Sequence, residues 1–287
     1  MSYIVFAWIA TIASGISLII SKLTSKYSIP NPLIMNFLIV FFAAIFTIPL
    51  ALFNHVGLPT DLSNIFLAAF FNILFLALFY FALYRLDVTT ISPLFNLRGV
   101  FGVLLGIFFI HEVINIQQII FIAVIIISSI FVTLDEKLKL SSFLKPAVLI
   151  MISATLALAL NGFFINKAAI HNNYWQLYVW INIVSFIILI PLFPFIFKEL
   201  KKLKIQQILV TALIASIGVV YTLTANKAYS SNVGITSVII SLPASMVISF
   251  ILSIVQPKLL EKHTLKVYII RFAATGIMVY AALLLSH

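Results

Sequence analysis

The sequence predicts an all-α polytopic membrane protein with about ten transmembrane helices. Hydrophobic residues make up 63% of the 287 residues and charged residues only 8%. A soluble domain is roughly 45–50% apolar and about 25% charged, so this chain has too few charges to cover a surface in water. Its apolar runs are continuous, whereas strands of a membrane β-barrel alternate apolar and polar residues. These observations exclude a soluble enzyme, a nucleic-acid-binding protein and a porin-like barrel.

Polar or turn-forming breaks divide the chain into stretches of roughly 20 mostly apolar residues, the length that crosses a membrane as a helix. The breaks include Pro-Asn-Pro after the first stretch, Asn-His-Val-Gly after the second, Asp-Glu-Lys between the halves and Lys-Lys after the seventh. No connecting segment is long enough for a soluble domain. The spans are expected near 3–21, 33–53, 62–84, 88–110, 114–134, 145–166, 175–197, 206–226, 234–256 and 266–286.

The two halves of the chain resemble each other at a constant offset of 145 residues, which predicts an internal repeat. Five spans per repeat is an odd number, so the second copy is expected upside down in the membrane, as in many secondary transporters. The expected repeats are 1–143 and 144–287. The alternative is a duplicated scaffold with no transport role. The matched pairs are Lys22 and Lys167, Pro49 and Pro194, Tyr84 and Tyr229, Val88 and Val233, and Ser92 and Ser237.

Two stretches of the first half carry a family resemblance. Residues 80–88 read Tyr-Phe-Ala-Leu-Tyr-Arg-Leu-Asp-Val and lead to Ser92-Pro93-Leu94, and residues 106–118 contain His-Glu before the fifth span. Both resemble EamA-type proteins of the drug/metabolite transporter superfamily, and residues 226–229 with Pro243 are similar to the same elements in the second half. The resemblance implies a ten-helix transporter or exporter of small metabolites with a central cavity between the halves. The chain departs from the family pattern at Ser14-Gly15, which lacks the usual Trp.

Nearly all Lys and Arg residues outside the spans lie at one predicted end of the helix bundle, which we call the lysine-rich end. The other end holds only Lys167 and Lys227. The positive-inside rule therefore places the lysine-rich end in the cytoplasm and both termini outside. The family resemblance implies the reverse, and the charge bias favours termini outside. The expected location is the cytoplasmic membrane, with the lipid bilayer as the surrounding partner.

Arg98 is the clearest functional candidate, because it lies about ten residues into the fourth span, near the expected midplane. An Arg there costs at least roughly 2.5–3.5 kcal/mol, so it should face the interior or a watery cavity. All seven acidic residues lie at span ends or in loops, so no acid pairs with it at that depth. Its planar fork suits a carboxylate, phosphate or sulfate. The alternative is that it binds backbone carbonyls or extends to one surface.

Polar residues and prolines within other spans are further candidates, and helix–helix hydrogen bonds explain the polar ones about as well as substrate binding. Pro93 and Pro243 are expected to bend the fourth and ninth spans for gating. Lys22 and Lys167 are either interfacial anchors or paired gate cations. Arg271 is expected near a surface with a lipid or loop role, and Gly102 with Gly106 forms a spacing that permits close helix contact. The substrate-binding candidates are Arg98, Asn96, Asn72, Tyr80, Asn161, Tyr221 and Ser245.

The sequence therefore indicates a secondary transporter of small organic metabolites, such as amino acids or other carboxylate-bearing compounds, working by alternating access. The substrate is expected to be anionic or zwitterionic, and the protein a monomer or homodimer that binds no nucleic acid. No catalytic residue, metal or cofactor is expected, since Asn115 stands where a zinc-protease motif starting at His111 needs its second His. The alternatives are a polyspecific exporter of lipophilic cations, with Phe75 and Phe79 lining a cavity, and a non-transporting scaffold or intramembrane enzyme.

Overall fold

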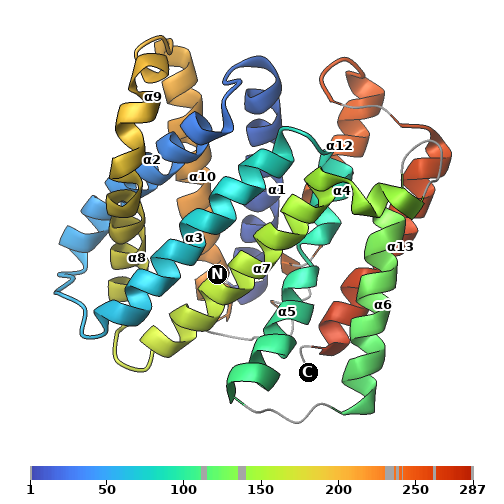
Figure 1. Cartoon of the computed structure of the whole chain (residues 1–287), viewed down its shortest axis with the longest axis horizontal. Helices are drawn as coiled ribbons and strands as arrows, with labels where there is room; N and C mark the ends of the chain where they lie inside the picture. Colours follow the sequence, from blue (N-terminus) through green and yellow to red (C-terminus); the bar gives the residue numbers. More distant parts are fainter. Residues whose placement is uncertain are drawn as a thin grey trace.

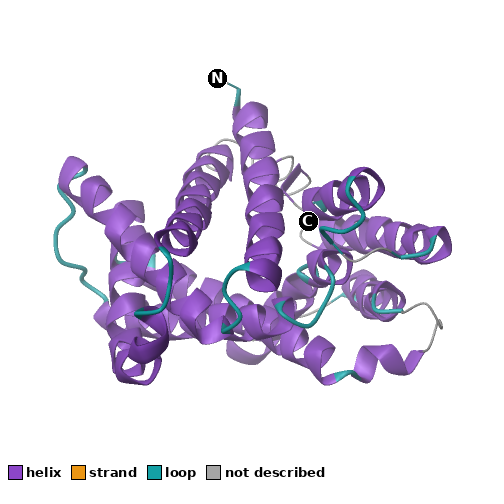
Figure 2. Ribbon diagram, turned by 90° about the horizontal axis from the view of Figure 1, so that it is seen from above, coloured by secondary structure: helices purple, strands orange, loops and turns teal. Residues whose placement is uncertain are grey.

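The described residues form helices joined by short connections, with no strand among them (Figures 1 and 2). The computed structural model describes residues 2–110, 115–134, 140–229, 236, 239–240, 242–260 and 263–285. Within these ranges, eight helical segments are long and apolar enough to cross a membrane, and two apolar helices are shorter. This confirms the prediction of an all-α polytopic membrane protein.

Each predicted span contains helical residues close to the expected limits. The fourth span is divided into α4, α5 and the π-helical turn Gly106–Ile110, and the seventh is divided at the 3₁₀ turn Ile190–Leu192. The helices are α1 (Tyr3–Tyr27), α2 (Pro32–Phe53), α3 (Leu62–Leu83), α4 (Val88–Leu94), α5 (Leu97–Leu105), α6 (Ile116–Val132), α7 (Pro146–Ala168), α8 (Tyr174–Leu189), α9 (Phe193–Leu200), α10 (Ile205–Tyr229), α12 (Ala244–Val255) and α13 (Leu265–Leu285).

Short polar side chains start several of these helices by satisfying free backbone N–H groups. The Asn31 side chain accepts from Leu33 N at 2.9 Å before α2. The helices α6 and α8 both begin with a capping box, in which an Asn and the Gln three residues later bond each other's backbone N–H. The polar breaks seen in the sequence therefore act directly as helix starts.

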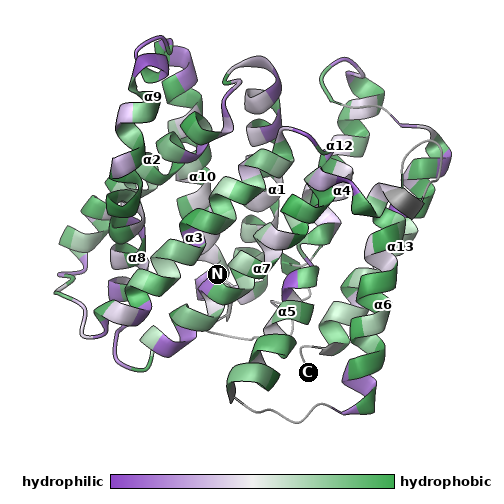
Figure 3. Cartoon of the chain, viewed as in Figure 1, coloured by the Kyte–Doolittle hydropathy of each residue, from purple (hydrophilic) through white to green (hydrophobic). Residues whose placement is uncertain are grey.

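The outer surface is apolar along the helices, and hydrophilic residues concentrate at the helix ends and loops (Figure 3). Large exposed hydrophobic side chains such as Phe70, Leu213 and Ile251 lie mid-helix, as expected for lipid-facing positions. The buried core instead holds tightly packed side chains such as Met35, Leu94 and Met278.

Packed helix pairs occur in a matched pattern between the two halves. With the repeat offset, α1 corresponds to α7, α2 to α8, α3 to α10, α5 to α12 and α6 to α13. Helices α1 and α10 pack together, and so do their counterparts α7 and α3, which lie side by side in Figure 1. In the same way α1–α12 matches α7–α5, and α2–α10 matches α8–α3. This pattern supports the proposal that 1–143 and 144–287 are inverted repeats.

Gly102 does not make the close helix contact that its spacing with Gly106 predicted. A Cβ atom added at Gly102 would meet no heavy atom within 4 Å. The expectation was wrong for Gly102 because its face of α5 is exposed and not packed against another helix, whereas Gly15 and Gly162 do approach other elements closely.

Candidate functional site

The fourth span is interrupted at Phe95 and Asn96, between α4 and α5. Pro93, in the last turn of α4, has no backbone N–H, which weakens the helix at this point. Its carbonyl instead accepts from Asn96 N at 3.0 Å and from Asn96 Nδ2 at 3.1 Å. Arg98 N then donates to Phe95 O at 3.0 Å, which starts α5. Asn96 therefore closes the turn that positions Arg98.

The ninth span is interrupted at a nearly equivalent position. Residues 239 and 240 are helical, 242 and 243 are not, and α12 begins at Ala244. The carbonyl of Pro243 accepts from Met246 N at 3.0 Å and from Val247 N at 3.2 Å, so it starts the helix. The repeat offset places residue 242 opposite Leu97, the first residue of α5. Both prolines thus sit at helix breaks, where gating was expected.

The two breaks meet. The Ser245 hydroxyl donates to the Ser92 hydroxyl at 2.8 Å, which joins the start of α12 to the end of α4. Irregular backbone at membrane depth is tolerated only where it is buried in protein or lines a water-filled cavity. Two such breaks in contact, one from each half, mark the most distinctive part of the molecule. We call Ser92–Gly99 together with Leu242–Ser245 the break site.

A glycine from each half packs against the break site. A Cβ atom on Gly15 of α1 would lie 3.0 Å from both Ala244 Cβ and Ser245 N, so a larger residue there would press on the α12 backbone. A Cβ atom on Gly162 of α7 would lie 2.9 Å from a terminal nitrogen of Arg98. The Arg98 guanidinium therefore lies against the α7 backbone, a helix of the other half.

The Arg98 side chain is exposed, and its guanidinium makes no hydrogen bond or ion pair with the residues that the structure describes. It lies in the first turn of α5, where the helix dipole presents its positive end. A guanidinium next to a helix N-terminus favours an anionic group, because both attract negative charge and offer N–H donors. The alternative interaction with backbone carbonyls is not seen among the described residues.

The remaining polar candidates mainly fasten helices to one another. Asn72 donates to Ser185 Oγ at 3.2 Å, joining α3 to α8, and Asn161 donates to Ala68 O at 2.9 Å, joining α7 to α3. Tyr80 is buried, and Tyr221 is partly buried on α10. Only Asn96, Arg98, Ser245 and the two prolines gather at the break site.

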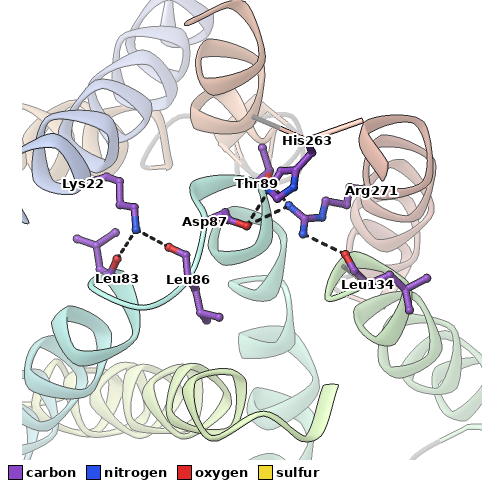
Figure 4. A network of polar contacts seen from close by, with 8 residues as sticks. All are labelled: Lys22, Leu83, Leu86, Asp87, Thr89, Leu134, His263 and Arg271. Atoms are coloured by element: carbon purple, nitrogen blue, oxygen red, sulfur yellow. Dashed lines mark hydrogen bonds and ion pairs between the residues drawn. The ribbon is translucent and has the colours of Figure 1, made fainter. Parts of the chain in front are cut away.

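Lys22 and Lys167 occupy equivalent sequence positions but different environments. Lys167 is exposed, with its ammonium 4.8 Å from the centre of the Phe163 ring. Lys22 is buried and donates to Leu83 O at 2.9 Å and Leu86 O at 2.8 Å (Figure 4). It caps the C-terminus of α3, where a positive charge interacts favourably with the helix dipole.

A charged network near Lys22 was not predicted from the sequence. Asp87 Oδ2 lies 2.8 Å from His263 Nε2 and 3.6 Å from an Arg271 nitrogen (Figure 4). Arg271 also donates to Thr89 Oγ1 at 2.6 Å and to Leu134 O at 3.0 Å. With an exposed fraction of 3%, Arg271 binds protein groups rather than having the lipid or loop role expected for it.

Burial alone would raise the pKa of Asp87. The hydrogen bond with His263 and the positive charges of His263, Arg271 and Lys22 outweigh this effect, so the pKa of Asp87 is lowered. The carboxylate therefore stays ionised near neutral pH. The only sequence signal for this network was Asp87 itself, an acid directly before the fourth span.

Residues 1–134 match the EamA-like transporter family. The matched region ends close to the boundary expected between the two halves, and it includes α4, α5 and the first-half contribution to the break site. No curated protein matches the chain.

Proposed function

We propose that this protein is a secondary transporter of small organic metabolites that carry a carboxylate, such as amino acids, because residues 1–134 match the EamA-like transporter family. The family is one of membrane transporters of small molecules. The carboxylate class, the cytoplasmic membrane and the alternating-access mechanism are our proposals.

Arg98 carries the proposal. It is a cation in the first turn of α5, beside a helix break, with no anionic partner among the described residues. In secondary transporters with discontinuous helices, the N-terminal ends of the half-helices point at anionic groups of the substrate. A substrate carboxylate at Arg98 would supply the missing negative charge and accept two parallel hydrogen bonds.

The break site also suits alternating access. Rocking one inverted repeat against the other needs flexible points close to the substrate. The Ser92–Ser245 hydrogen bond and the Gly15 and Gly162 contacts all join one half of the chain to the other at the break site. We infer that movement of α4–α5 against α12 changes the side from which Arg98 is reached, with Pro93 and Pro243 as the hinges.

The lipophilic-cation alternative has less support. The positive charge of Arg98 would repel a cation at the break site. Among the aromatic residues considered for binding, Phe75 and Phe79 pack against each other and against Phe95, with ring centres 5.7–6.2 Å apart. These rings serve as helix packing in this structure.

The test is thermal stabilisation of the purified protein by amino acids, other organic acids, phosphate esters and lipophilic amines. A ligand at about 100 times its Kd adds about 2.7 kcal/mol to the stability of the folded state. For a chain of this size, this corresponds to a rise in Tm of about 5 °C or more. We expect carboxylates to raise the Tm of the wild type and not that of Arg98→Gln.

Arg85→Gln is the matched control, because Arg85 is an exposed arginine in the loop before α4, away from the break site. It should respond to carboxylates as the wild type does. Stabilisation of the wild type and Arg98→Gln to the same extent would overturn the role of Arg98. Stabilisation by amines alone would favour the cation exporter.

A further inference from the structure

At the lysine-rich end, the charged network joins the two halves of the chain. Asp87, Thr89 and Leu134 belong to the first half, and His263 and Arg271 belong to the second (Figure 4). The partners are 176, 182 and 137 residues apart in the sequence. None of these residues lies in the break site, so the network has no part in the substrate contact proposed above.

Hydrogen bonds between neutral groups also join the halves, both at the lysine-rich end and at the opposite end. Thr60 N donates to Asn172 Oδ1 at 2.8 Å, and the Trp180 indole donates to Gly57 O at 2.9 Å. These are hydrogen bonds between neutral groups, but a charged contact also crosses the halves at the opposite end, because the charge of His171 helps to lower the pKa of Asp61. A change of charge in the Asp87 network acts on the connection between the halves at the lysine-rich end.

Within the network, the groups differ in how they respond to pH. Asp87 faces His263, Arg271 and Lys22, and the ring of His263 lies 5.8 Å from that of Tyr268. Arg and Lys keep their charge throughout the physiological range, and Tyr stays neutral. An imidazole is the side chain that ordinarily changes charge between about pH 5 and 8. Among the described groups around Asp87, His263 is the one whose side-chain type ordinarily changes charge in this range.

We propose that His263 and Asp87 form a proton-binding latch between the two halves, closed when His263 is protonated and loosened when it loses that proton. In the closed latch, protonated Nε2–H donates to the Asp87 carboxylate as a charge-assisted hydrogen bond. Such bonds are roughly twice as strong as neutral ones. When the proton leaves for solvent, the carboxylate keeps Arg271 at 3.6 Å but loses the charge of its nearer partner.

The consequence for transport rests on the proposed function: opening the latch would allow the halves to separate at the lysine-rich end and so expose the substrate path there. The latch itself needs no substrate. Transport would then depend on proton binding although none of the acidic residues that the structure describes lies in the middle of a span.

The experiment uses electron paramagnetic resonance to measure the distance between two spin labels on the full chain in lipid nanodiscs. The chain has no cysteine, so Arg85→Cys and Lys266→Cys provide the labelling positions. Both residues are exposed, one before α4 and the other at the start of α13, on the two sides of the latch. Distances are compared at about pH 5.5 and about pH 8.5, which bracket the usual titration of histidine.

We expect a single short distance at the lower pH and a second, longer population at the higher pH. His263→Lys keeps a positive charge at both values, so it should give the short distance throughout. Glutamine at position 263 cannot gain or lose a proton. The distance distribution of His263→Gln should therefore be the same at both pH values and include the longer population. The control His171→Gln removes the histidine that faces Asp61 across the halves at the opposite end, and it should still behave as the wild type.

A wild-type distribution that is identical at the two pH values would overturn the latch, as would a pH-dependent shift that persists in His263→Gln. The outcome is independent of the proposed function. If the distance shift is present and no carboxylate binds to or crosses with the protein, the latch holds and the carboxylate-transporter proposal fails.

Discussion

Gly162 has no side chain, and this leaves room for the guanidinium of Arg98 beside the α7 backbone. Arg98 lies in the first turn of α5, and a terminal nitrogen of its guanidinium is 2.9 Å from where a Cβ atom of residue 162 would be. A bare backbone at this point lets a long, charged side chain lie against α7 within a largely apolar bundle. We propose that this contact holds the guanidinium in position to bind an anion.

Gly162→Ala should weaken carboxylate binding with little change in stability. The added Cβ would come within 2.9 Å of an Arg98 nitrogen, so the guanidinium must move, and the end of a flexible side chain can do so at low cost. Alanine is also favoured over glycine inside a helix by roughly 1 kcal/mol. Isothermal calorimetry should show several-fold weaker binding, with a ligand-free Tm equal to or slightly above that of the wild type. Gly102→Ala, which meets nothing within 4 Å, is the control, and equal binding by both variants would contradict the claim.

At the scale of helices, the break site depends on how closely α1 approaches α12. Gly15 faces the backbone of Ala244 and Ser245, which cannot move aside as the end of a side chain can. The same glycine-to-alanine change should therefore have different consequences on α1 and on α7.

Gly15→Ala should destabilise the protein by about 1–3 kcal/mol, the usual cost of overpacking a well-packed contact. Thermal unfolding in detergent measures this effect as a lower Tm. Gly218→Ala on α10, where a Cβ atom meets nothing within 4 Å, should leave the Tm close to that of the wild type. If Gly15→Ala unfolds at the wild-type temperature, α1 and α12 are not in tight contact.

The charged network holds the ends of α3, α4 and α6 close to α13. Its contribution to the stability of the folded protein should fall in acid. The pKa of Asp87 is lowered in the folded protein, whereas an unfolded Asp has a pKa of about 3.9. Its stabilisation is therefore fully present above that value and is lost as pH falls through the folded pKa. When the pH is lowered from about 6 to about 3, the Tm of the wild type should therefore fall further than the Tm of Asp87→Asn. Equal losses would mean that the ionised carboxylate adds no stability.

For the whole molecule, the positive-inside rule and the repeat pattern define a topology. The exposed Lys202 and His171 lie at opposite ends of the bundle, and the chain has no cysteine of its own. With the lysine-rich end in the cytoplasm, a membrane-impermeant thiol reagent on intact cells should label His171→Cys and spare Lys202→Cys. The reverse pattern would place both termini in the cytoplasm, as the family resemblance implies.

The fold could be predicted from the sequence because the bilayer fixes the length of an apolar helix, so hydropathy alone locates the spans. Pro93 and Pro243 indicated bends, but the sequence could not show that the two breaks meet through Ser92 and Ser245. Arg98 was recognisable from its depth within an apolar stretch.

The Asp87 network was not predictable by the same reasoning. Its residues stand at span ends, where charges are ordinary, and its partners lie more than a hundred residues apart. Only packing of the two halves brings them together. Asn72 and Asn161 were also recognisable as buried polar groups, but the sequence could not distinguish helix contacts from substrate contacts.

The central claim is that Arg98 at the break site binds the carboxylate of a transported metabolite. The most direct measurement is the exchange of a radiolabelled carboxylate, chosen from the stabilising compounds, across liposomes that contain the purified protein. We predict saturable exchange by the wild type and Arg85→Gln, and at least a tenfold loss in Arg98→Gln, since a charged hydrogen bond contributes about 1.5–3 kcal/mol. Exchange by Arg98→Gln at the wild-type rate and affinity would contradict the account.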